Sequence, residues 1–462
     1  MPDKQSHLEA TEIISAEEFD KAFALLTELV DLSEANNIYR NRGNAIYTSC
    51  VVLWMLIYQR LKPDASLETA VKHLNKTQPT YLPKNKRLSQ GKLSTSTAGY
   101  SQARSKLPLE VVQWFSSEVC QAIIAESKPL LDDLTIFLID GTTMKLAPEK
   151  ELQTAFPPAS NQHGQGVWPI ALLTVFHELG SGCALLPQVG AMYGPDAVSE
   201  TELARRGMLM LPANSLVMTD AGFGIFGVAY EAVRCGHEAL LRMKKANFES
   251  LRKKATLVSQ TDNSKTYSLT WRPTSSNRKT QPNLPEDASV EVVLHEVTLS
   301  DTLTLYLVTT LDRDANTLAE LFKYRVEVEF DIRNLKVVMD TENIRAKSVD
   351  VFLKELYTSV VAYNLVGQFR RQAAEIINEP PRRMSFKRTW TTFQTFLLQS
   401  LHSNPQDWRK DFEQALYYAT KDKLPNRPGR TAKRQAYKKR PKDCQFQKRK
   451  KPASKITPKD LK

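Results

Sequence analysis

The sequence predicts an α/β fold, because short apolar strands alternate with helical segments in mid-chain and helical periodicity dominates on both sides. At 462 residues the chain is too long for one ordinary core, so several domains are expected. In order, these are a helical N-terminal domain, the first part of the core, a β-rich insertion, the second part of the core, C-terminal helices and a basic disordered tail. Their predicted limits are residues 1–126, 127–245, 246–312, 313–378, 379–420 and 421–462.

The composition is that of a soluble protein, with 42% apolar and 25% charged residues. No run reaches the roughly 18 apolar residues that cross a bilayer, and the polar start of the chain does not read as a secretory signal. The five cysteines are scattered and odd in number, which argues against a disulfide framework and a zinc site. We therefore expect a cytoplasmic protein without a membrane partner.

The basic excess of the chain lies at its C-terminal end. Residues 421–462 carry 17 Lys and Arg against 3 Asp and Glu, whereas the whole chain has a net charge of +12. Such a run is usually a solvated, disordered arm. A polycation also binds nucleic-acid phosphates without reading sequence. The tail is compatible with a nucleic-acid partner but does not identify one.

The N-terminal part is predicted to be helical. Apolar residues recur with helical spacing in Phe19–Leu32 and Leu109–Ala125. A polar interval, Lys76–Ser105, separates the helices as a loop or arm. The basic side chains of this interval could face phosphates, although a solvated loop is more common. They are Lys84, Lys86, Arg87 and Lys92.

Two apolar strands each end in an aspartate that a glycine follows within two residues. Thr135–Ile139 leads into Asp140, and Ser215–Thr219 leads into Asp220. Acids at the carboxyl ends of neighbouring core strands share one crevice, and carboxylate oxygens suit Mg²⁺ or Mn²⁺. The alternative is that each aspartate only caps a turn or a helix. The other predicted core elements are strands at Trp168–Phe176, Ala184–Val189 and Glu238–Met243, and helices at Val198–Met210 and Ile225–Arg234.

From about residue 246 the pattern becomes β-rich. Thr266–Trp271, Val290–Val297 and Thr302–Thr310 alternate apolar and polar residues between long polar turns. This segment is predicted to be an insertion rather than a continuation of the core. Helix returns at Asn316–Lys336 and at Val349–Asn378, and a last helical region follows the break at Pro380.

The helix at Asn316–Lys336 places charged residues among apolar ones. At 100° per residue, Arg325, Glu329 and Lys336 fall on the face that carries Leu318 and Ile332. Charges directed at a core cost several kcal/mol unless they are paired or liganded. Either these groups form a mutual ion-pair cluster, or the glutamate binds a metal between two phosphate contacts.

The segment Leu321–Lys336 resembles the Y-x2-R-x3-E-x6-K signature of the insertion-sequence-four family of bacterial DDE transposases. Arg325, Glu329 and Lys336 match its R, E and K, whereas Phe322 stands where the family has Tyr and lacks the hydroxyl. Upstream, Leu138–Thr142 and Thr219–Phe223 resemble the regions of the family's two aspartates.

This resemblance implies an RNase-H-like catalytic core. Asp140, Asp220 and Glu329 would be the catalytic residues and the ligands of two Mg²⁺ or Mn²⁺ ions about 4 Å apart. Contacts to DNA would come from Phe322, Arg325 and Lys336, and from N-terminal helices that recognise the terminal inverted repeats.

The implied function is cut-and-paste transposition of an insertion sequence, by strand cleavage at the element ends and 3′-OH transfer into target DNA, by at least a dimer. Three alternatives remain open: a nuclease of the same fold without joining activity, a catalytically silent transposase-derived DNA-binding protein, and a hydrolase of small phosphate esters.

Overall fold

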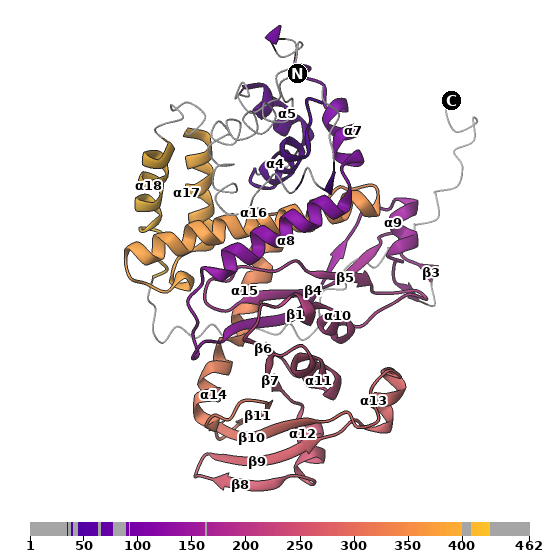
Figure 1. Cartoon of the computed structure of the whole chain (residues 1–462), viewed down its shortest axis with the longest axis vertical. Helices are drawn as coiled ribbons and strands as arrows, with labels where there is room; N and C mark the ends of the chain where they lie inside the picture. The colour runs from indigo at the N-terminus through magenta and orange to yellow at the C-terminus, as the bar shows by residue number, and fades with distance from the viewer. Residues whose placement is uncertain are drawn as a thin grey trace, which may run out of the picture. The chain divides into compact units, whose positions relative to one another are not determined.

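A nine-stranded mixed sheet lies at the centre of the described chain, with strand order β5-β4-β1-β6-β7-β11-β10-β9-β8 (Figure 1). Helices cover the sheet, so the α/β class predicted from the sequence is confirmed. The strands are β1 (Thr135–Lys145), β4 (Ile170–Glu178), β5 (Gln188–Ala191), β6 (Ser215–Thr219), β7 (Glu238–Arg242), β8 (Thr256–Gln260), β9 (Ser264–Trp271), β10 (Val290–Ser300) and β11 (Leu303–Thr309).

The computed structural model describes residues 35, 38–39, 45–62, 66–76, 89–91, 93–161, 164–399 and 408–425. The described residues up to Lys423 belong to one compact unit. Three features predicted from the sequence fall outside the described residues: the helix at Phe19–Leu32, the basic side chains Lys84, Lys86, Arg87 and Lys92, and the tail beyond Pro425. No helix in the described part of the chain is long and apolar enough to cross a membrane.

Strand β1 has a hydrogen-bonded neighbour on each side. It pairs in parallel with β6 over Thr135–Ile139 and antiparallel with β4 as far as Lys145. The strand predicted from the sequence was expected to end at Asp140, and this is wrong. Only the parallel pairing stops there, because β6 ends at Thr219, while β4 continues to supply hydrogen-bond partners.

Apolar residues on both faces of the sheet hold the helices in place. In β1, Ile136 and Leu138 pack in one cluster with Leu318 of helix α14 (Ala315–Phe322). The alternate residues Phe137 and Ile139 face the opposite cluster, to which helices α10 and α11 contribute. These helices and the short turn between them are α10 (Glu200–Gly207), η1 (Met208–Met210) and α11 (Phe226–Arg234). Burial of both faces explains why the strand sequences are almost continuously apolar.

The segment from 246 to 312 is rich in strands, but it extends the core sheet. Strand β11 pairs antiparallel with β7, with Leu307 opposite Arg242, and β10, β9 and β8 follow outward. The expectation that this segment does not continue the core is therefore corrected. A free edge at β7 would leave backbone groups unpaired beside the buried Ala239–Leu241, and β11 satisfies them. Two short helices, α12 (Lys245–Arg252) and α13 (Ser275–Thr280), accompany these strands.

The helix predicted at Asn316–Lys336 changes its type three times. After α14 come the 3₁₀ turn η2 (Lys323–Val326), helix α15 (Glu327–Arg333) and the π-helical turn η3 (Asn334–Val338). A 3₁₀ turn advances about 120° per residue instead of 100°. A uniform helical wheel therefore misplaces the side chains that follow Phe322.

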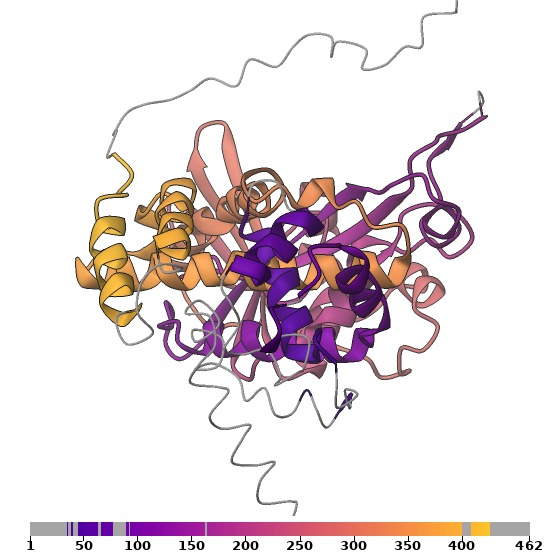
Figure 2. The ribbon, with the colours of Figure 1, turned by 90° about the horizontal axis from the view of Figure 1, so that it is seen from above.

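The long helix α16 (Val349–Ile376) runs beside α8 (Leu109–Ala125), as Figure 1 shows. Glu355 of α16 forms buried ion pairs with Arg60 and Arg104, which ties α4 and α7 to this helix. The remaining helices are α4 (Ser49–Arg60), α5 (Leu67–Lys76), α7 (Ala98–Lys106), α9 (Lys150–Ala155), η4 (Thr341–Asn343), η5 (Pro381–Arg383), α17 (Phe386–Gln399) and α18 (Trp408–Ala419). Seen from above, the two-stranded ribbon of β2 (Ser160–Asn161) and β3 (Gly164–Gln165) projects from the body (Figure 2).

Candidate active site

Asp140 and Asp220 lie next to each other on neighbouring parallel strands. Ile139 of β1 is in register with Thr219 of β6, so the two aspartates follow at the same level of the sheet. Parallel neighbours direct equivalent side chains to one edge of the sheet. The two acids, each of which follows an apolar strand in the sequence, therefore lie side by side in the structure.

Each aspartate uses one oxygen locally and presents the other to Arg325. The Gly141 and Gly222 amides donate to the Oδ1 atoms of Asp140 and Asp220, both at 2.8 Å. Nη2 of Arg325 lies 2.8 Å from Oδ2 of Asp140 and 3.7 Å from Oδ2 of Asp220. The turn-capping alternative therefore accounts for Oδ1 of each aspartate. The Oδ2 atom of each points toward the shared Arg325 guanidinium.

Burial raises the pKa of Asp140 above its ordinary value. The Arg325 guanidinium and the Gly141 amide oppose this shift, while the negative charges of Asp220 and Glu329 add to it. Like-charged carboxylates close enough to affect one another disfavour ionisation of a neighbour. Asp140 is therefore harder to ionise than an isolated aspartate.

Glu329 is the third acid beside Arg325 and follows it by one helical turn. Its Oε1 lies 3.6 Å from Nη1 of Arg325, and its side chain is 46% exposed. The sequence predicts a core-facing position for this glutamate, and that is wrong. The 3₁₀ turn at Lys323–Val326 rotates α15, so that Val328 and Asp331 are buried and Glu329 stands at the rim of the site.

Arg325 is the common partner of all three carboxylates. No group of three His, Cys, Asp or Glu side chains among the described residues is already drawn together closely enough to hold a metal ion. The guanidinium is instead a stand-in cation, within 3.7 Å of an oxygen of each acid. An all-carboxylate donor set around one positive charge fits a hard divalent cation in chemistry and in charge.

Lys336 is held by β1, and Phe322 is buried in the core. Nζ of Lys336 donates to Thr143 O at 2.8 Å and to Thr142 Oγ1 at 3.2 Å, and burial lowers the pKa of this amine. Phe322 is 8% exposed and packs with Leu318 in the core. The ring at 322 fills an apolar site, so a DNA contact there is not supported. The neighbouring Tyr324 is exposed.

Glu200 is an acid near the site that the sequence analysis did not single out. It is the first residue of α10, and its carboxyl end lies against Gly141. This partial burial raises the pKa of Glu200, and the charges of Asp140 and Asp220 raise it further. The sequence contains one signal for this contact. Gly141 is a glycine inside a strand, and such a glycine often marks the close approach of another group.

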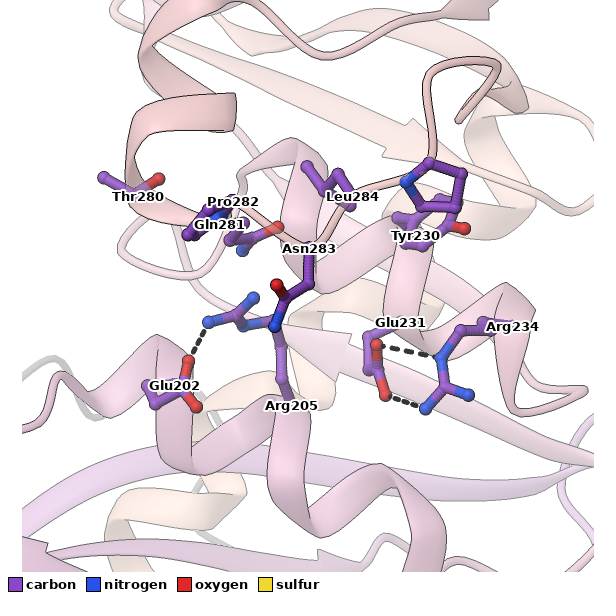
Figure 3. A pocket seen from close by; sticks show the side chains of 11 residues that line it. Glu202, Arg205, Tyr230, Glu231, Arg234, Thr280, Gln281, Pro282, Asn283 and Leu284 are labelled. Carbon is purple, nitrogen blue, oxygen red and sulfur yellow. Dashed lines mark hydrogen bonds and ion pairs between the residues drawn. The ribbon is translucent and has the colours of Figure 1, made fainter.

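A pocket of about 530 Å³ lies away from the three acids, between α10, α11 and the segment after α13 (Figure 3). Its arginines are already paired, Arg205 with Glu202 and Arg234 with Glu231. It includes none of the site residues predicted from the sequence and offers little uncommitted charge. The acids around Arg325 remain the better candidate for chemistry.

Comparison with known proteins identifies the region that carries these acids. The family model for the transposase DDE domain matches residues 132–365, which include Asp140, Asp220 and Glu329. The mixed sheet with helices on both faces is consistent with the RNase-H-like architecture of such a domain. No curated protein matches the chain.

Proposed function

Because the chain belongs to the transposase DDE domain family, we propose that it cuts DNA at the ends of an insertion sequence and joins the freed ends to target DNA. The observation that carries the proposal is the meeting of Asp140, Asp220 and Glu329 around Arg325. These acids come from two parallel strands and from a helix more than a hundred residues further along the chain. Membership of the insertion-sequence-four subfamily is part of the proposal and rests on the signature at Arg325, Glu329 and Lys336.

Asp140, Asp220 and Glu329 would hold two Mg²⁺ or Mn²⁺ ions, with Arg325 giving up part of its contact with them. Bound divalent cations supply a Lewis acid that favours ionisation of the attacking hydroxyl and neutralises charge on the phosphate. The freed guanidinium is then available to a DNA phosphate, as a charge-assisted donor.

Lys336 would position strand β1 rather than contact DNA. Its amine fixes Thr142 and Thr143, directly after Asp140 and Gly141, and so holds the extended path of β1 past the first acid. This assigns Lys336 a positioning role in place of the phosphate contact expected from the signature.

The proposed reaction has two steps, each of which forms one P–O bond and breaks one. In the first, water attacks a phosphodiester at the element end and leaves a 3′-hydroxyl. In the second, this hydroxyl attacks a phosphodiester of the target, and the displaced target oxygen departs. The number of phosphodiester bonds is unchanged in the second step, so no ATP is required. Two ends must meet, which calls for at least a dimer on DNA.

The test is Glu329→Gln in the full-length protein, with a DNA that carries the sequences flanking the gene. The variant should bind this DNA like wild type, while Mg²⁺-dependent strand cleavage falls at least about a hundredfold, as expected when an electrostatic stabiliser is removed. Glu320→Gln is the matched control, because Glu320 is exposed and, within the described part of the chain, its ion pair is with Lys323 on the same run of helix.

Joining is assayed separately with a pre-cut end and a target plasmid. Wild-type joining that Glu329→Gln loses supports the transposase. Cleavage without joining would identify a nuclease, and DNA binding without either activity would identify a silent derivative. Wild-type cleavage by Glu329→Gln would contradict the assignment of this residue.

A further inference from the structure

We propose that strand β8 is a contact between two copies of this chain, which pair antiparallel along it and so join their sheets. The inference goes beyond the proposed function, which calls for two copies on DNA and assigns no surface to their contact. It is carried by the exposure of β8, by its uncharged middle and by the opposite charges at its two ends.

Strand β8 is the outermost strand of the nine-stranded sheet, next to β9 (Figure 1). All five of its residues are exposed, and among them Leu257 and Val258 are 52% and 63% exposed. The outer side of such a strand presents backbone amides and carbonyls that a further strand can satisfy. The described part of the chain therefore leaves β8 open to pairing with one more strand.

The middle of β8 has no charged side chain to prevent such pairing. Seven consecutive residues, Ala255–Thr261, include no charged residue and no proline. Sheets usually protect an exposed edge with charges, with proline or with a bulge. Of these three, β8 has a bulge, between Leu257 and Ser259 where it pairs with β9.

The charges at the two ends of β8 are of opposite sign. Lys254 stands four residues before Val258 and Asp262 four residues after it, and both are exposed. Neither side chain forms an ion pair with another described residue.

This arrangement makes β8 complementary to a second copy of itself. Antiparallel pairing about Val258 places Lys254 of each copy beside Asp262 of the other, whereas parallel pairing places like charges together. A two-fold axis at Val258 repeats the contact, as in the symmetric dimers that proteins most often form. The charges therefore favour one partner and one direction of pairing.

A simpler explanation is that the bulge alone keeps this edge unpaired. It accounts for the irregular pairing with β9, but not for the exposure of Leu257 and Val258 or for the charges at the two ends. The two explanations predict different association states. Because two five-residue strands bury less than the roughly 800 Å² per partner of a standard interface, we expect a weak dimer, with a Kd of about 10–100 μM.

The experiment is sedimentation velocity of the full-length protein without DNA, across a range of protein concentrations that spans this Kd. Val258→Lys should weaken dimerisation at least about tenfold, because two lysines then meet at the axis. Leu209→Lys is the matched control, since Leu209 is 71% exposed on η1, outside the sheet, and this variant should dimerise like wild type. A wild type that stays monomeric, or equal behaviour of the two variants, would overturn the inference.

Reversal of the end charges tests the direction of pairing. Lys254→Glu and Asp262→Lys should each weaken self-association by about fivefold, because like charges then meet at both ends. An equal mixture of the two variants should dimerise like wild type, since both end contacts of the mixed dimer join opposite charges. A mixture as weak as its components would contradict antiparallel pairing of β8.

Hydrogen exchange locates the contact and identifies other occupants of the edge. The amides of Thr256–Gln260 should exchange more slowly as the protein concentration rises. Protection that does not depend on concentration would show that another segment of the same chain covers β8, and the inference would fail. Glu329→Gln should dimerise like wild type, so these measurements and the cleavage assay can fail separately.

Discussion

Arg325 joins three carboxylates that would otherwise repel one another. Its strongest contact is with Asp140, at 2.8 Å, where both side chains are mostly buried; the contacts with Asp220 and Glu329 are longer and more exposed. Attraction between partly solvated charges is weakened by water. Asp140 therefore depends on Arg325 more than the other two acids do.

Arg325→Gln should lower the melting temperature in EDTA, because Asp140 loses its buried counter-ion, at a cost of about 1–3 kcal/mol. Addition of Mg²⁺ should restore most of the loss, since a bound cation replaces the guanidinium. Thermal denaturation with and without Mg²⁺ measures both effects. The control is Arg234→Gln, which breaks an exposed pair with Glu231 and should show no Mg²⁺-dependent recovery. Loss that Mg²⁺ does not restore would contradict the replacement.

Single residues also show where sequence reasoning is limited. The meeting of Asp140, Asp220 and Glu329 at one place could be predicted, because strand ends and a motif are local patterns. The burial of Phe322 and the contact of Lys336 with β1 could not, since both depend on the exact rotation of a helix against the sheet. Glu200 was missed because its neighbour Gly141 lies nearly sixty positions away in the sequence.

Elements were predicted well in kind and less well in extent. Strand β6 has the predicted bounds, but β1 continues beyond Asp140 because β4 provides a second partner that no local pattern reveals. The helix at Asn316–Lys336 exists, yet it is divided by 3₁₀ and π turns. A hydrophobic pattern reports which segments are buried, and tertiary contacts decide where an element bends or stops.

A buried ion pair fixes the segment that carries Glu329. Asp331, 1% exposed, accepts two hydrogen bonds from Arg382, at 2.8 and 3.1 Å. Arg382 also reaches Glu327 at 3.3 Å and donates to the carbonyls of Glu178 and Leu179 after β4. Helix α15 is thereby attached to the end of β4, and the rim position of Glu329 depends on this attachment.

Asp331→Ala should destabilise the protein by about 3 kcal/mol, because it leaves the Arg382 guanidinium buried without its closest carboxylate. Chemical denaturation measures the change in unfolding free energy. Replacing both partners with apolar residues, Asp331→Leu with Arg382→Met, should recover much of the loss, since no buried charge remains. A double variant as unstable as Asp331→Ala would show that the attachment depends on contacts other than this pair.

The molecule as a whole extends its core sheet in one direction and covers it with helices drawn from both ends of the chain. The β-rich segment lengthens the sheet at β7, on the side away from β4 and β5. Both aspartates lie on strands near the middle of the sheet, where neighbours on each side hold them. The edge on which strands pair depends on long-range hydrogen bonds that the alternation of apolar and polar residues does not specify.

The charge of the basic tail contrasts with that of the rest of the chain. Residues 421–462 carry 17 basic and 3 acidic side chains within a chain whose net charge is +12, so the remainder is slightly acidic. In the proposed function this segment would supply sequence-independent affinity for DNA. The first residues of the segment have structural contacts: Asp422 accepts from Thr392 at 3.0 Å, and Lys423 pairs with Glu379. A truncation must therefore keep residues up to Pro425.

Deletion of residues 426–462 should weaken binding to a random-sequence duplex and flatten its salt dependence, since fewer counterions are released from the phosphates. Each lost phosphate contact reduces the slope of log K against log salt by about 0.9, so a fall of several units is expected. Fluorescence anisotropy across a series of salt concentrations measures both quantities. The matched control keeps the length of the tail but replaces its Lys and Arg with Gln, and it should behave like the deletion because charge alone is responsible. If the deletion leaves the slope unchanged, the phosphate contacts must come from the slightly acidic remainder of the chain.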